Sequence, residues 1–228
     1  MSSETRAVTP VAEAAEAVAN QSRHKVKHDN LTILRHSLKS VRQHGFATPS
    51  ISALPRPLAI TCGVFGGSYL LYKLLPGPSS LSVERNLTVT RFGSPLSLAT
   101  YHATHTSLLG VAVNAYVMST FGKFHWQTLG ARSLMTVSAV GAVLASLATA
   151  RAVSEDDSYT AAGANGISAA LITFHAFRTP KLFGSLPLFR LAPVGVVALA
   201  ALYSVKYNDQ GLLAGIGGGY LAFLLGLF

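Results

Sequence analysis

Long apolar stretches separated by short polar segments make up the chain from residue 57 onward. The hydrocarbon core of a bilayer is about 30 Å thick and a helix rises about 1.5 Å per residue, so a spanning helix needs about 20 apolar residues. Such stretches occur at 57–75, 96–121, 128–150, 159–177, 186–205 and 210–228. The pattern therefore predicts six membrane-spanning helices, with both termini on one side of the membrane.

The composition supports a membrane protein. Half of the 228 residues are hydrophobic and only 12% are Asp, Glu, Lys or Arg, whereas soluble domains carry about 25% charged residues. This composition argues against an ordinary soluble enzyme, a disordered regulator and a nucleic-acid-binding module. A single cysteine, Cys62, excludes a disulfide framework and a cysteine-based zinc site. We expect an all-α, polytopic membrane protein.

The predicted domains are a basic polar N-terminal extension, residues 1–56, and a six-span membrane domain, residues 57–228. The extension holds eight of the 18 Lys and Arg residues. It lacks an apolar run long enough for a secretory signal, and its basic, serine-bearing composition is typical of a mitochondrial targeting or matrix-facing segment. The alternative is a solvated tail that touches anionic lipid headgroups.

Basic residues that flank the spans indicate the orientation of a membrane protein. The basic loop residues on the side of the extension are Lys123, Arg178, Lys181 and Arg190. Those on the other side are Arg85, Arg91, Arg151 and Lys206, together with acids that include Glu155, Asp156 and Asp157. The loops alone are nearly balanced, so the extension decides the orientation. Its side is the cytosol or the mitochondrial matrix.

Three groups of polar and small residues lie within the predicted spans. His105 precedes Asn114 by nine residues, the run Gly163-Ala164-Asn165-Gly166 opens the fourth span, and Gly215 and Gly219 are four residues apart in the sixth. Polar side chains in a span usually face the bundle interior and mark a functional site. Glycine pairs let helices approach closely.

In order and spacing, these motifs resemble the rhomboid intramembrane proteases over residues 57–228. The resemblance implies that His105 and Asn114 occupy positions that help to hold the oxyanion. It places Asn165 where the family has its nucleophilic serine, in a Gly-x-Ser-Gly turn. It places Leu212 where the family has its general-base histidine, three residues before Gly215. Another histidine, usual four residues before the asparagine, is replaced by Gly110.

The resemblance also implies that the chemistry is lost. An amide does not attack a carbonyl, and a leucine side chain has no lone pair with which to accept a proton. Asn165 and Leu212 are therefore degenerate dyad positions, and His105 and Asn114 are vestigial. Ser168 as a substitute nucleophile lacks a base. We expect a catalytically inactive pseudoprotease, and an unrelated six-helix bundle with chance glycine pairs stays the alternative.

The small residues of these motifs are expected to serve packing. We predict that Gly163 and Gly166 of the fourth helix meet Gly215 and Gly219 of the sixth, because close contact replaces the hydrophobic driving force that lipid removes.

Other histidines suggest weaker alternatives. His102, His105 and His175 are conceivable haem ligands, but His175 is predicted at the opposite membrane face from Asn165. Zinc bound by His102 and His105 would lack carboxylate or thiolate partners. We expect no metal, no cofactor and no small-molecule substrate.

These expectations combine into one leading function. It is a scaffold or accessory subunit of a mitochondrial inner-membrane complex, either a protein translocase or a respiratory or ATP-synthase assembly, with both termini in the matrix. The expected partners are other integral membrane subunits, transmembrane clients and lipid, and no nucleic acid. One alternative is a client-binding pseudorhomboid in endoplasmic-reticulum quality control, which would favour a long cytosolic C-terminal tail. The other is an active intramembrane serine protease.

Overall fold

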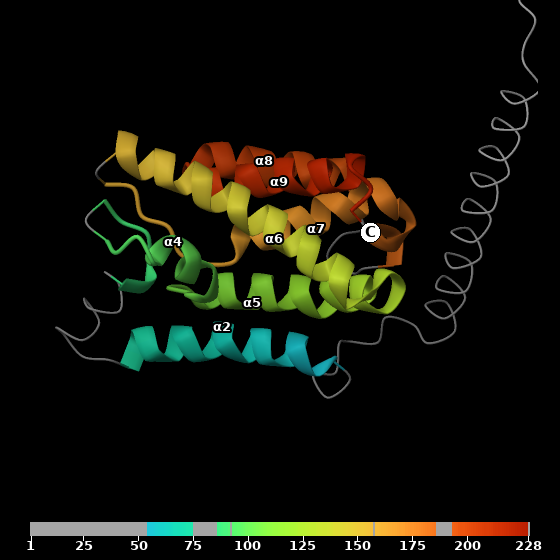
Figure 1. The fold of residues 1–228 in the computed structure, drawn as a ribbon, viewed down its shortest axis with the longest axis horizontal. Helices are drawn as coiled ribbons and strands as arrows, with labels where there is room; N and C mark the ends of the chain where they lie inside the picture. The colour runs from blue at the N-terminus through green and yellow to red at the C-terminus, as the bar shows by residue number, and fades with distance from the viewer. Residues whose placement is uncertain (1–53, 75–85, 92, 157, 186–192, 228) are drawn as a thin grey trace, which may run out of the picture. The chain divides into compact units, whose positions relative to one another are not determined.

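The computed structural model describes residues 54–74, 86–91, 93–156, 158–185 and 193–227. These residues belong to one compact unit, Phe46–Phe228. Apart from a single antiparallel bridge between Val89 and Ala161, they form helices and the turns that join them (Figure 1). The all-α prediction is confirmed. Most of the predicted N-terminal extension, residues 1–53, lies outside the described residues.

The first predicted span is helix α2, Arg56–Leu74. Its buried side chains are Leu58 and Phe65, and the helix packs against α5 (Leu108–Val117) and the π-helical segment η3 (Met118–Gly122). Large apolar side chains on the rest of its surface stay exposed, namely Ile60, Val64, Leu70, Leu71 and Leu74. The helix therefore has an apolar outer surface as well as an apolar inner one.

The prediction of a single helix over 96–121 is wrong in its first half. Residues 97–103 form two short turns, α4 (Ser97–Thr100) and η2 (Tyr101–Ala103). The long helix begins only at Leu108, because the extended Ser107 caps it and its hydroxyl accepts the Gly110 N–H at 3.0 Å. A side-chain cap of this kind fixes a helix start that hydropathy alone does not show.

The predicted second and third spans are joined. Helix α5 continues through η3 into α6, Lys123–Glu155, and the one non-helical residue inside α6 is Gly130, with φ 86° and ψ 169°. Beyond this break α6 returns beside the turns that precede α5, since the Ser146 hydroxyl donates to the Leu98 carbonyl at 2.8 Å. Helix α6 therefore runs back toward the level at which α5 begins. Among the described residues, Leu108–Glu155 is the stretch long and apolar enough to cross a membrane.

Helices α7 (Asn165–Arg178) and α9 (Gln210–Leu224), of 14 and 15 residues, are shorter than expected. Helix α8 (Pro193–Tyr207) has 15 residues, and residues 186–192 of the predicted fifth span lie outside the described residues. At about 1.5 Å per residue, 15 residues extend only about 22 Å. The expected start of the fourth helix at residue 159 is corrected to Asn165, because residues 158–164 form a loop that pairs with Val89.

Helix α7 is the centre of the bundle, with α6 and α9 packed closely against it (Figure 1). Small residues make this possible. A Cβ atom added at Gly215 would lie 2.2 Å from the Gly166 carbonyl oxygen, and one added at Gly219 would lie 2.2 Å from that of Ala170. Helices α7 and α9 therefore run parallel in register, in backbone contact. On the other side, a Cβ atom at Gly141 of α6 would lie 2.5 Å from the Ala170 Cβ.

In these helices many polar side chains are buried, and many large apolar side chains are exposed. The buried polar side chains include His105, Asn114, His125, Thr149, Ser168, Thr173 and His175. Exposed large apolar side chains cover the outer surfaces, among them Leu109, Met135, Leu147, Leu199, Leu202 and Leu221. Soluble monomers rarely expose contiguous apolar patches larger than a few hundred Å². The surface thus fits an apolar surrounding.

Candidate functional site

Two sequence motifs and the turn before α9 meet at one end of the bundle. Asn114 comes from the first turns of α5, Asn165 is the first residue of α7, and Asp209 is the N-cap of α9. Because α7 and α9 run parallel, their N-termini lie side by side. The structure thus brings His105, Asn114 and Asn165 together, as the resemblance predicts for the positions that they match.

Asn114 is the hub of this cluster. Its amide nitrogen lies 2.9 Å from the Gly110 carbonyl, 3.1 Å from the Asn165 Oδ1 and 3.1 Å from the His105 Nε2. Its own oxygen accepts the hydroxyl of Ser168. The side chain is buried, with 1% of its surface exposed. Asn114 therefore ties α5 to α7 through the interior, and Ser168 is held as a donor to an amide.

Asn165 continues the chain toward α9. Its amide nitrogen donates to the Asp209 Oδ2 at 2.8 Å. The other carboxylate oxygen, Oδ1, accepts the backbone N–H of Leu212 at 2.8 Å, which caps the helix. We call the connected side chains Ser168, Asn114, Asn165 and Asp209 the amide chain. Asp209 was not anticipated from the sequence, although an acid directly before an apolar helical run is a cap signal.

Leu212, the second degenerate dyad position, lies half-buried in the first turn of α9. Its backbone N–H, and not its side chain, contacts the amide chain, because it donates to the Asp209 carboxylate. The residue therefore lies near Asn165 in space, as the resemblance predicts. A leucine side chain there supplies no acceptor for a proton.

Gly163 departs from the packing expectation. It precedes α7, adopts φ +106°, and its N–H donates to the Tyr101 carbonyl at 2.8 Å. A Cβ atom there would lie 3.6 Å from the His105 ring and not against α9. Gly163 shapes the turn because only glycine adopts this backbone conformation readily. Gly166, Gly215 and Gly219 do lie in the helix contact.

A second buried cluster, at the opposite end of the bundle, was not anticipated. The Ser133 hydroxyl donates to the Leu227 carbonyl at 3.2 Å and lies 2.8 Å from the His125 Nε2. His125 Nδ1 lies 3.2 Å from His175 Nε2, and His175 Nδ1 lies 2.9 Å from the Thr179 hydroxyl. Both imidazoles are fully buried.

The hydrogen-bond directions in this cluster follow from Ser133. Since its single proton goes to Leu227, its oxygen accepts the His125 Nε2–H, and His125 Nδ1 is then the acceptor for the His175 Nε2–H. In this arrangement each of these hydrogen bonds has one donor and one acceptor, and both imidazole rings are neutral. The cluster ties the ends of α6, α7 and α9 together, and His175 lies near the end of α7 opposite to Asn165.

The histidines considered for haem or zinc are separated. His102 Nε2 lies 3.0 Å from the Ser146 hydroxyl, His105 bonds Asn114, and His175 belongs to the second cluster. Within the described part of the chain, no three His, Cys, Asp or Glu side chains are grouped to hold a metal ion.

A cavity of about 400 Å³ opens beside Asn165. Its walls come from η2, the loop between α6 and α7, and the α8–α9 turn, and they include Tyr101, Tyr159, Tyr203, Tyr207, Asp156 and Asp209. Asp156 accepts the Ser158 hydroxyl at 2.6 Å and the Ser158 N–H at 2.8 Å, and these bonds lower the pKa of Asp156.

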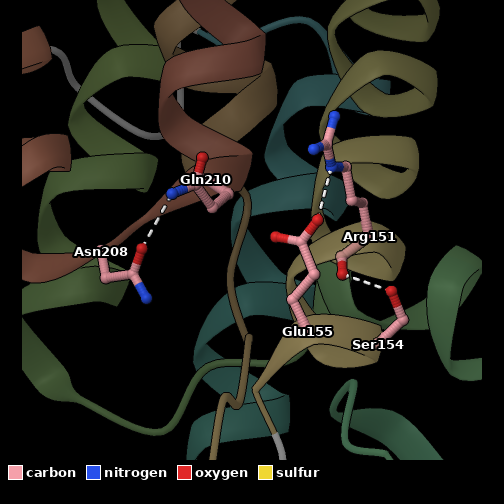
Figure 2. A network of polar contacts seen from close by, with 5 residues as sticks. All are labelled: Arg151, Ser154, Glu155, Asn208 and Gln210. Atoms are coloured by element: carbon pink, nitrogen blue, oxygen red, sulfur yellow. Dashed lines mark hydrogen bonds and ion pairs between the residues drawn. The ribbon is translucent and has the colours of Figure 1, made fainter.

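Polar side chains near the end of α6 and in the α8–α9 turn form two further contacts (Figure 2). The Arg151 Nε donates to Glu155 at 2.8 Å on the exposed side of α6, and the Gln210 amide donates to Asn208 at 2.8 Å across the α8–α9 turn. Asn208 has φ +53°, which asparagine tolerates better than most residues.

Comparison of the chain with protein-family models, with curated proteins and with solved structures finds no match. The function is therefore argued from the site itself.

Proposed function

We propose that the chain is a non-catalytic, rhomboid-like integral membrane protein that serves as a scaffold or accessory subunit of a mitochondrial inner-membrane complex. The amide chain is the observation that carries the proposal. Where the resembled enzymes have a nucleophile and a base, this chain has Asn165 and Leu212, and Asn165 is bonded to both Asn114 and Asp209. The amide chain holds three helices together, and neither the Asn165 amide nor the Leu212 side chain can attack a carbonyl or accept a proton.

The surface supports integration into a membrane. Leucine, valine and methionine side chains stay exposed on α2, α5, α6, α8 and α9, while histidine and asparagine side chains are buried. Apolar side chains facing lipid and polar ones facing the interior are what a bilayer requires. The six-span topology belongs to this proposal.

The packing supports a structural role. Gly166 and Gly215 bring the backbones of α7 and α9 into contact. Such a contact stabilises the fold whether or not the site is catalytic. In contrast, Cβ atoms added at Gly63, Gly66 and Gly67 on α2 would meet nothing within 4 Å. That side of α2 has room for a helix of another subunit or of a client. The mitochondrial location rests on the basic composition of residues 20–56.

Proteolytic inertness is tested with the purified full chain. We incubate it with a transmembrane rhomboid substrate and, separately, with a fluorophosphonate probe, and use Ser168→Ala as the matched control. Neither cleavage above a mock preparation nor labelling is expected. Labelling that Ser168→Ala abolishes would overturn the non-catalytic assignment.

Assembly and location need a second experiment. A tagged chain is expressed in its own cells, mitochondria are isolated, and carbonate extraction, protease protection and blue-native electrophoresis follow. We expect a carbonate-resistant protein in the inner membrane that migrates in a complex well above its own 23.9 kDa. Residence in the endoplasmic reticulum, or migration as a lone chain in its detergent micelle, would contradict the proposal.

A further inference from the structure

The cavity beside Asn165 has acidic side chains in its lining. Among the described residues that line it are two carboxylates, Asp156 and Asp209, and no lysine or arginine. The Asp209 carboxylate is held by two neutral donors, the Asn165 amide and the Leu212 N–H. Within the described part of the chain, the ion pair at this end of the bundle joins Arg151 to Glu155 outside the cavity (Figure 2). The described part of the lining is therefore electronegative, with no basic side chain of its own to neutralise it.

Aromatic rings complete the lining. Tyr203 and Tyr207 are one turn apart on α8, their ring centroids are 4.5 Å apart, and they are 53% and 59% exposed. Tyr101 and Tyr159 form the buried wall. The face of a tyrosine ring attracts a cation within about 6 Å of its centroid.

Lys206 shows that these rings are accessible to a cation. Its Nζ lies 5.3 Å from the centroid of the Tyr207 ring. Lys206 does not line the cavity. The chain's own ammonium group therefore occupies one position beside Tyr207, and the positions around Tyr203 and Asp209 are left for a ligand.

The α8–α9 turn is held in place before any ligand binds. The Asp209 N–H donates to the Ser204 carbonyl at 2.9 Å, and the Ser204 hydroxyl donates back to the Asp209 carbonyl. Gln210 and Asn208 are bonded across the same turn (Figure 2). Groups held in their binding geometry lose little freedom when a ligand arrives.

We propose that this cavity binds an organic ammonium group, of the kind found in choline and ethanolamine, between the Asp209 carboxylate and the Tyr203 ring. A volume of about 400 Å³ lies in the range of small-molecule sites. The ligand is either the headgroup of a lipid or the corresponding free amine. A metal ion fits less well, because the described residues offer no group of three ligating side chains.

The first test compares choline with its neutral analogue 3,3-dimethyl-1-butanol, in which carbon replaces nitrogen. Binding to the full chain in dodecyl maltoside is measured by titration calorimetry or saturation-transfer NMR. Choline is expected to bind at least about tenfold more tightly than the analogue, since only choline carries the charge.

Two substitutions locate the site. Asp209→Asn keeps a good helix cap but removes the charge, and should weaken choline binding about tenfold. Tyr203→Leu should weaken it as well, whereas Tyr203→Phe, which keeps the ring, should change it by less than about twofold. Tyr203 is exposed, so the leucine variant keeps the proposal testable even if Asp209→Asn loses stability.

A lipid arm separates the two sources. The wild type and Tyr203→Leu are reconstituted in nanodiscs that contain phosphatidylcholine and phosphatidylglycerol, and the lipids retained after extraction are identified by native mass spectrometry. Selective retention of phosphatidylcholine that Tyr203→Leu abolishes indicates a lipid headgroup. Binding of free choline without such retention indicates a free amine.

The outcomes against the proposal are equally defined. It is overturned if neither choline nor phosphatidylcholine binds selectively, or if the neutral analogue binds as tightly as choline. It is also overturned if binding is unchanged in both Asp209→Asn and Tyr203→Leu.

Discussion

The side-chain amide of Asn165 donates to the carboxylate of Asp209 across 2.8 Å, and so joins the first residue of α7 to the cap of α9. The bond unites two helix starts that are 44 residues apart in the sequence. It also places the residue that matches the protease nucleophile in a structural role. The consequences are testable by changing the charge at position 165.

Asn165→Asp should make stability depend on pH. Two carboxylates at hydrogen-bond distance cannot both ionise readily, so the pKa of the pair would rise above the unfolded value of about 3.9. Above that raised pKa the variant should lose about 1–3 kcal/mol of unfolding free energy. As the pH falls through it, a shared proton should restore the bond and the stability.

Asn165→Ala is the control for that experiment. It loses the same hydrogen bond but adds no charge, so its deficit relative to the wild type should change far less with pH than that of Asn165→Asp. Thermal unfolding in detergent between pH 8 and pH 4 measures both variants. Parallel pH profiles for Asn165→Asp and Asn165→Ala would show that position 165 does not face the Asp209 carboxylate.

Gly215→Ala should destabilise the bundle more than its small size suggests. The added Cβ atom would lie 2.2 Å from the Gly166 carbonyl oxygen, so α7 and α9 must separate. Overpacking of a tight contact costs about 1–3 kcal/mol. Gly217→Ala is the matched control, because a Cβ atom there meets nothing within 4 Å. This control should keep or slightly raise stability, since alanine favours a helix. Equal melting temperatures for the two variants would refute the close contact.

The buried histidine pair should behave as a coupled unit. His175→Phe leaves the His125 Nδ1 without its donor, and an unsatisfied buried group costs about 1–3 kcal/mol. His125→Phe has the converse effect on the His175 Nε2–H. The double variant should be more stable than the sum of the two single losses predicts, because both partners are then removed. Strict additivity in a double-mutant cycle would show that the two rings do not interact.

The ends of α6 should lie on opposite sides of the membrane. Gln127 and Ser158 are exposed near those ends, and a Cys62→Ala background removes the native thiol. Single cysteines at positions 127 and 158 should react with an impermeant reagent from different sides, with position 127 on the side of the basic extension. Labelling of both from one side would contradict the proposed topology.

Hydropathy and turn residues predicted the first helix closely. The expected 57–75 became Arg56–Leu74, because an apolar run followed by Pro76-Gly77-Pro78 has an unambiguous end. The helix expected from Leu96 failed for an equally local reason. Residues 97–107 include His102, His105 and several hydroxyl side chains, and they form turns that end at the Ser107 cap and pack on α6.

Residues of the candidate site were predicted only at positions that match the motifs of the resembled family. His105, Asn114 and Asn165 were placed together by motif order, and the structure brings them together. Asp209 and His125 were missed because their partners, Asn165 and His175, are 44 and 50 residues away. Periodicity reports which face of one helix is apolar, whereas such pairs depend on how separate helices are arranged in space.

The break at Gly130 has a consequence for how the chain is inserted. Without it, Leu108–Glu155 would be a straight rod of roughly 70 Å, more than twice the bilayer's hydrocarbon thickness. The backbone angles φ 86° and ψ 169° belong to a region open essentially to glycine alone. In the proposed six-span topology, the direction in which α6 and every later helix crosses the bilayer would therefore depend on Gly130. Replacing it would favour the rod and leave a population of molecules with an inverted C-terminal half.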